Sequence, residues 1–215
     1  MKKSIFNVMI VFFAGLSLAL VMIPAKAQAD PLSIDFGTGE ADPGGSITLL
    51  AGPNATGSGI PVDTLRVQGM GLNELYDTSG SFSFNNETAA VLSFNTQTGA
   101  ISIVGGVPSL DVPDGTALLS GTFSSFLIDQ PYGSLVSISG SGSDVKDVTL
   151  LTQLGIDPKT QWGFFGFSIS ANFDPEKNTG NAISTDITNT RVPEPTTLLL
   201  LGSGLLGVLA LRRKQ

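Results

Sequence analysis

The stretch "SFSFNNETAAVLSFNTQTGAISIVGG", residues 81–106, carries the clearest structural pattern in this chain. Phe82 and Phe84 fall on one face of an extended segment, and Ile101 and Ile103 do the same further along. Apolar and polar residues also alternate in the "AVLSFN" run between them. A period of two marks strands with one buried face. The stretch therefore predicts a meander of three antiparallel strands.

The same alternation extends over most of the chain. Besides the meander, strands are predicted at 46–51, 65–70, 117–128, 134–143, 163–173 and 182–188. Segments rich in Gly, Pro, Asn and Asp separate these runs, among them "GPNATGSG" at 52–59, and such residues favour turns. About nine strands joined by turns predict an all-β domain over residues 28–191, either an antiparallel β-sandwich or a jelly-roll-like arrangement.

One stretch, "SDVKDVTLLTQLGID", has helical spacing instead. Val148, Leu151 and Leu154 recur every three residues, and a glycine follows them as a stop. Ser143 or Asp144 is expected to cap this short helix.

The body of the chain, between its two apolar ends, is strongly acidic. Residues 28–193 contain seventeen Asp and Glu against five Lys and Arg, a net charge near −12. This charge favours solubility and argues against binding nucleic acid or anionic lipid. The chain has no cysteine, so a packed core and not disulfides must hold one domain of this length.

The absence of His and Cys also limits the chemistry. A Ser-His-Asp triad, a Cys nucleophile and a His- or thiolate-ligated metal are all excluded. Acid–base chemistry would have to come from carboxylates, Lys or Tyr, and a pair of carboxylates could hydrolyse a glycoside. Most of the acidic residues lie in turn segments, where Asp is favoured for local reasons. We therefore expect no enzymatic activity and no required cofactor.

The stretch "QWGFFGFSIS" contains the only tryptophan of the chain and three phenylalanines. Trp162 and Phe164 are candidate carbohydrate contacts, because aromatic rings beside glycines can form a stacking platform. The alternative is a core strand, in which the rings are buried and the glycines make room for them.

Calcium binding remains open. The segment 171–181 places Asn172, Asp174, Glu176 and Asn178 at every second position, and hard cations prefer such oxygen ligands. The segment 35–42 has a weaker set of acidic residues. Neither follows the EF-hand pattern, and a solvated turn explains each equally well.

The N-terminus has the features of a secretory signal peptide, predicted at residues 1–27. Two lysines precede an apolar stretch at 8–23, and small residues follow it. Cleavage fits equally well after Ala27, with Ala25 upstream, or after Ala29. The alternative is an uncleaved N-terminal anchor.

The C-terminal end is also apolar, with a short transmembrane segment predicted at 196–211. Its aliphatic part, 198–211, would span about 21 Å as a helix, against a hydrocarbon core of about 30 Å. Arg212, Arg213 and Lys214 follow it and are expected to stay in the cytoplasm. This is a weak anchor that leaves the acidic body outside.

The tail resembles the PEP-CTERM sorting signal of exported bacterial proteins. The resemblance covers residues 192–215 and rests on Val192-Pro193-Glu194-Pro195, a Gly-interrupted Leu-rich run and an Arg-rich end. It implies recognition and processing by exosortase, a membrane enzyme, near the Pro-Glu-Pro motif. The two prolines disfavour helix and keep this site extended and accessible.

The family resemblance also implies a destination. Such proteins occur in Gram-negative bacteria that make extracellular polysaccharide, and many belong to the cell surface or matrix. We therefore expect a protein held transiently at the inner membrane and then released to the surface or the extracellular matrix, with a structural or adhesive role. The alternative is a carbohydrate-binding module that contacts the polysaccharide directly.

Overall fold

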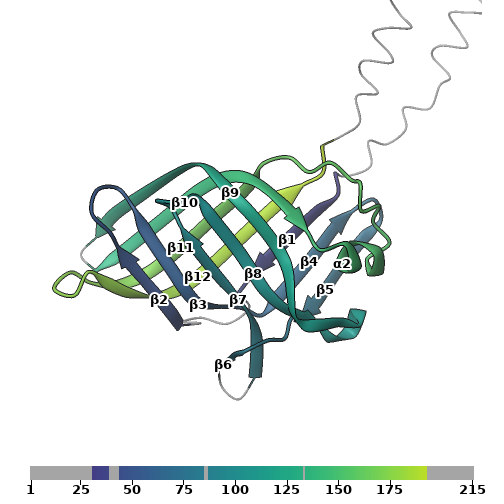
Figure 1. Ribbon diagram of the computed structural model, residues 1–215, viewed down its shortest axis with the longest axis horizontal. Coiled ribbons are helices and arrows are strands. Elements are labelled where there is room, and N and C mark those ends of the chain that lie inside the picture. Colours follow the sequence, from purple (N-terminus) through teal and green to yellow (C-terminus); the bar gives the residue numbers. More distant parts are fainter. Residues whose placement is uncertain (1–30, 39–43, 85–86, 133, 193–215) are drawn as a thin grey trace, which may run out of the picture. The chain divides into compact units, whose positions relative to one another are not determined.

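The computed structural model describes residues 31–38, 44–84, 87–132 and 134–192. The chain divides into two compact units, Met1–Asp30 and Pro31–Gln215. The first unit lies outside the described residues, as does the predicted signal peptide within it. The fold is therefore that of the second unit, which is built almost entirely from strands (Figure 1).

Twelve strands, one α-helix and one turn of 3-10 helix make up the described part of the chain. In chain order they are β1 (Ser33–Gly37), β2 (Gly44–Leu49), β3 (Ala55–Val62), β4 (Thr64–Gly69), β5 (Leu72–Asp77), β6 (Phe82–Phe84), β7 (Glu87–Asn95), β8 (Ala100–Val107), η1 (Pro108–Leu110), β9 (Val112–Tyr132), β10 (Leu135–Lys146), α2 (Val148–Gln153), β11 (Phe165–Asp174) and β12 (Thr179–Thr190). Every strand pairing between them is antiparallel.

Eight of these strands close into a barrel. Strands β11, β10, β9, β8, β7, β3, β2 and β12 are neighbours in that order, and β12 pairs again with β11 to complete the ring. The predicted β-sandwich or jelly-roll-like arrangement is therefore wrong. A sandwich and a barrel show the same alternation along each strand; what decides between them here is the pairing of β2 with β12, which are far apart in the sequence.

A side branch leaves the ring at β12. One edge of this long strand pairs with β2 through Thr179–Ala182 and with β1 through Asp186–Thr190. Strand β1 then pairs with β4, and β4 with β5, so that these three extend the sheet beyond the ring (Figure 1). The other short addition is β6, which pairs with β7.

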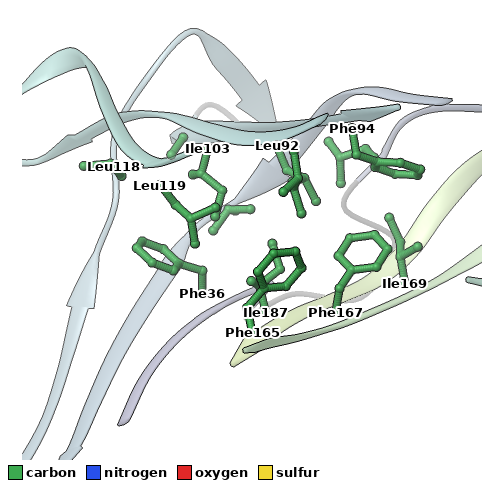
Figure 2. Close-up of a cluster of buried hydrophobic side chains, with 14 of the residues drawn as sticks. Phe36, Leu92, Phe94, Ile103, Leu118, Leu119, Phe165, Phe167, Ile169 and Ile187 are labelled. Carbon is green, nitrogen blue, oxygen red and sulfur yellow. The ribbon is translucent and has the colours of Figure 1, made fainter. Parts of the chain in front are cut away.

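Aromatic and aliphatic side chains fill the interior of the ring (Figure 2). Phe94, Phe123, Phe165 and Phe167 meet edge to face, with ring centroids 5.2 to 6.4 Å apart. This is the geometry that aromatic pairs prefer. An eight-stranded barrel has an interior that side chains can just fill, and here they do so with large apolar groups.

Two glycines let the backbone approach these rings. A Cβ on Gly57 would lie 2.1 Å from Cε1 of Phe94. A Cβ on Gly142 would lie 2.0 Å from the carbonyl oxygen of Thr122 and 2.8 Å from Cε1 of Phe165. Real side chains cannot approach so closely, so each large ring requires the absence of a side chain at its partner position on the neighbouring strand.

The nine predicted strands are all present, and the predicted meander is β6, β7 and β8. The sequence reasoning missed β1, β3 and β5. Strand β3 was hidden because the Gly- and Asn-rich segment 52–59, predicted as a turn, forms its first half. The predicted core character of "QWGFFGFSIS" is confirmed for Phe165 and Phe167, which are buried.

The predicted helix is α2, but its cap differs from the prediction. Asp147 is the N-cap, and its Oδ1 accepts a hydrogen bond from the backbone N–H of Leu150 at 2.9 Å. Ser143 and Asp144 belong to β10 instead. Leu150 and Leu151 are buried and anchor the helix on the core.

No helix within the four described ranges combines the length and apolar character needed to cross a bilayer. The fold prediction of a C-terminal transmembrane helix therefore has no counterpart in the described structure. The segment for which it was predicted, 196–211, lies outside the described residues.

Two adjacent phenylalanines test the packing of the interior. We expect Phe165→Ala to lower the free energy of unfolding by about 3–5 kcal/mol, because it empties a fully buried site in the aromatic cluster. Phe164→Ala should change it by no more than about 0.5 kcal/mol, because that ring is 72% exposed. Denaturant unfolding of the two variants measures both values, and equal losses would contradict the described packing.

Candidate functional site

The domain ends beside the tail that carries the predicted sorting motif. After β12, the backbone N–H of Arg191 donates to the carbonyl of Leu32 at 2.7 Å, and that of Val192 donates to the carbonyl of Gln161 at 3.1 Å. Val192 is 45% exposed and is the last described residue. The folded domain therefore holds the chain up to the first residue of the predicted motif.

Most of the predicted sorting and cleavage residues cannot be placed. Those outside the described residues are Pro193, Glu194, Pro195, Arg212, Arg213, Lys214, Ala25 and Ala27. Their roles remain predictions from the sequence.

The two candidate carbohydrate contacts do not form one platform. Trp162 is partly buried against the core, and Nζ of Lys146 lies 4.3 Å from the centroid of its ring. Phe164, two residues on, is largely exposed. One indole face is thus occupied by Lys146 of the protein itself, whereas the ring of Phe164 is largely open to an external contact.

Beside Trp162 lies a buried polar cluster that the sequence reasoning did not single out. Asp144 and Lys146 are two residues apart on β10 and share its inner face. Nζ of Lys146 is 2.6 Å from Oδ2 of Asp144, and both side chains are fully buried. The amide of Asn189, on β12, donates through Nδ2 to Oδ1 of Asp144 at 2.6 Å and to the carbonyl of Gly163 at 3.2 Å.

Burial controls the charge of this cluster. It lowers the pKa of Lys146, while the charge of Asp144 and their hydrogen bond oppose the shift. Nε1 of Trp162 and Oδ1 of Asn189 are buried and have no hydrogen-bond partner among the described residues. Such unpaired groups are costly, and their presence beside a buried ion pair marks the cluster as unusual.

Two of the surface hollows lined by described residues differ in character. One, of about 390 Å³, adjoins the polar cluster and is lined by Asp144, Lys146, Trp162 and residues of the α2–β11 connection. The other, of about 570 Å³, lies at the β2–β3 turn and is lined mainly by residues 49–54. No ionisable side chain is among the eight residues lining this second hollow, so only the first combines a recess with reactive groups.

A second unusual group is a carboxyl pair on β1 and β12. Asp35 lies between Arg66 and Thr188 of the neighbouring strands. Burial raises the pKa of Asp35 to about 7, and the hydrogen bond and charge of Asp186 act in the same direction. Thr188 and Arg66 oppose the shift. At neutral pH the Asp35 carboxyl is therefore protonated for part of the time.

The candidate calcium segment 171–181 forms the hairpin between β11 and β12. Oδ1 of Asp174 accepts from the backbone N–H of Glu176 at 3.0 Å, and Oδ2 lies 2.8 Å from Nζ of Lys177. The hydrogen bond from Lys177 lowers the pKa of the Asp174 carboxyl. Both oxygens of the Asp174 carboxylate thus have partners within the turn. Calcium binding at this segment stays a prediction.

A signal for the polar cluster was present in the sequence. "SDVK" continues the alternation of "SLVSISGSGS", which places Asp144 and Lys146 on the inward face of a strand. Two opposite charges on an inward face indicate a buried pair. Asn189 could be placed inside in the same way from the alternation around 182–188, but its contact with β10 depends on the closed ring.

Residues 191–214 match the family model of the PEP-CTERM protein-sorting motif. The chain therefore carries a PEP-CTERM sorting signal, as the resemblance of its tail predicted. This motif marks exported proteins that exosortase, a membrane enzyme, sorts and processes. No curated protein matches the chain, and no solved structure does.

The raised pKa of Asp35 makes a prediction for stability. Below its ordinary pKa of 3.8, this carboxyl is protonated in both the folded and the unfolded chain. Between 3.8 and about 7 only the folded chain keeps the proton, so the free energy of unfolding falls as pH rises through this window.

We expect Asp35→Asn to be more stable than the wild type above pH 7, because the amide keeps a donor for Asp186 and has no charge to bury. A gain of 1 kcal/mol corresponds to about 2–4 °C in Tm for a domain of this size. The difference in stability between Asp35→Asn and the wild type should disappear toward pH 4. Thermal unfolding between pH 4 and 8.5 measures it, with exposed Asp129→Asn as the control; parallel curves for Asp35→Asn and wild type would contradict the shift.

Proposed function

We propose that the barrel is a structural or adhesive component of the bacterial cell surface or extracellular polysaccharide matrix, delivered there by cleavage of its sorting tail. The observation that carries the proposal is the position of the matched motif. It begins at residue 191, directly after the last strand of the domain. The processing site thus lies at the exit of a folded body, where an enzyme can reach it without unfolding the domain.

The character of the domain supports a passive role. Its interior is filled with apolar side chains, and its surface is acidic. The carboxyl pair of Asp35 and Asp186 is joined by a hydrogen bond, closer than the roughly 5 Å that separates the two carboxyls of retaining glycosidases. We therefore propose that the domain is not an enzyme and needs no cofactor.

Direct binding of carbohydrate is the second candidate, and the exposure of Phe164 is the observation that favours it. Trp162 contributes less, because Lys146 covers one face of its ring. We expect Phe164→Ala to leave retention of the protein on extracellular polysaccharide unchanged. Co-sedimentation with polysaccharide from the producing cells measures this, and loss of retention would favour the carbohydrate-binding module.

The sorting proposal is tested in the full chain, expressed in a bacterium that has exosortase. We expect Pro193→Ala, Glu194→Ala and Pro195→Ala together to block processing, because an alanine run no longer keeps the site extended. The wild type should lose its tail and leave the membrane fraction. The triple variant should keep Gln215 and stay there. Mass spectrometry of the C-terminus and cell fractionation measure both.

Asp157→Ala, Pro158→Ala and Lys159→Ala make a matched control. These three exposed residues also include a proline and lie in the α2–β11 connection, away from the motif in the sequence. This variant should be processed like the wild type. Unchanged cleavage and release of the 193–195 variant would overturn the proposal.

A further inference from the structure

The seam between β10 and β12 is bridged by side chains, because β11 begins late. The pairing of β10 with β11 ends at Gly142 and Phe165, and that of β11 with β12 ends at Gly166 and Thr188. Beyond these pairs, β10 continues to Lys146 and β12 to Thr190. Asp144, Lys146 and Asn189 occupy this extension and connect the two strands.

One carboxylate holds an amine and an amide side by side. Oδ2 of Asp144 binds Nζ of Lys146 and Oδ1 binds Nδ2 of Asn189, each at 2.6 Å. The orientation of the amide follows from its neighbours, because both groups near Nδ2, the carboxylate and the carbonyl of Gly163, are acceptors. The amide carbon and the amine are thus fixed by the same acid group.

We propose that Lys146 and Asn189 join in an intramolecular isopeptide bond, with Asp144 as the proton carrier. Nζ of Lys146 attacks Cγ of Asn189, so that an Nζ–Cγ bond forms and the Cγ–Nδ2 bond breaks. Asp144 accepts a proton from the ammonium, passes it to Nδ2, and accepts a second from Nζ as ammonia leaves. The net change is the loss of one ammonia, and no oxidant, reductant or cofactor is consumed.

The surroundings favour each part of this step. Burial lowers the pKa of Lys146, which increases the share of neutral amine, the form that can attack. The indole of Trp162 covers the amine at 4.3 Å and keeps water from it. Asp144 contacts both nitrogen atoms whose protons change.

The unpaired atoms of the cluster also fit the reaction. Negative charge develops on Oδ1 of Asn189 during the attack, and this buried oxygen has no hydrogen-bond partner in the described part of the chain. Nε1 of Trp162, a donor in the same cluster, is also without one. An indole N–H is the kind of donor that stabilises such an oxyanion. The adjoining hollow gives ammonia a way out.

The bond would be seen directly by peptide mapping of the purified, folded full chain. Trypsin cannot cleave after an acylated Lys146, so we expect residues 67–159 to remain together and to be joined to residues 178–191. The branched species should be about 17 Da lighter than the sum of the two peptides, the mass of one ammonia. A succinimide at Asn189 has the same mass loss but leaves the peptides separate.

Three variants assign the roles. Lys146→Arg keeps the charge beside Asp144 but has no amine, and Asp144→Asn keeps hydrogen bonding but not the proton carrier; both should lack the branched peptide. Lys159→Arg with Asn181→Ser changes exposed residues of the same types and should keep it. Circular dichroism checks that each variant folds.

The wild-type result is decisive by itself, whatever the variants do. If the folded protein is then denatured and digested, and trypsin cleaves after Lys146 while peptide 178–191 has its unmodified mass, the proposal is overturned and the cluster is a buried ion pair. A branched peptide that persists in Asp144→Asn would overturn the role of the carboxylate. Neither result depends on the sorting of the tail.

Discussion

The structure depends on filling a closed ring of eight strands with four aromatic rings. Phe94, Phe123 and the pair Phe165 and Phe167 come from three strands and meet edge to face. They fit because glycines of other strands face them without side chains. Packing and strand order therefore specify each other: a strand displaced by one residue would put a side chain where a ring lies and turn its own apolar face outward.

Toward the ends of β10 and β12 the inner face becomes polar. Gly142 faces Phe165, whereas the next two inward residues of β10 are Asp144 and Lys146. Buried charges gain little for stability compared with apolar groups of the same size, so the simplest continuation of the core would have been aliphatic. Instead, an amine, a carboxylate and an amide meet there, beside two unpaired polar atoms. The proposed isopeptide bond explains this arrangement better than packing does.

The local features of the sequence predicted nine of the twelve described strands, because alternation reports which face of a strand is buried. They did not predict ring closure, since the pairing of β2 with β12 joins residues such as Ile47 and Gly180 that are far apart in the sequence. The sorting motif is a local pattern and could be recognised completely. The polar cluster was not predicted: the sequence analysis took Asp144 as a candidate helix cap, although its spacing from Lys146 would place both on one inward face. The position of Asn189 beside them follows only from the closed ring.

The tail follows a strand that pairs with three others. Strand β12 pairs with β11 along one edge and with β2 and β1 along the other. Because the sorting signal begins at residue 191, any tension on the tail before cleavage acts on the end of β12 first. Asn189 lies two residues before that point, and its amide donates a hydrogen bond to Asp144 of β10. The cluster therefore holds the end of β12 at which strand separation under tension would start. A covalent bond between Lys146 and Asn189 would strengthen the barrel at the point where the tail applies force. It would leave the other strand pairings of the sheet unchanged.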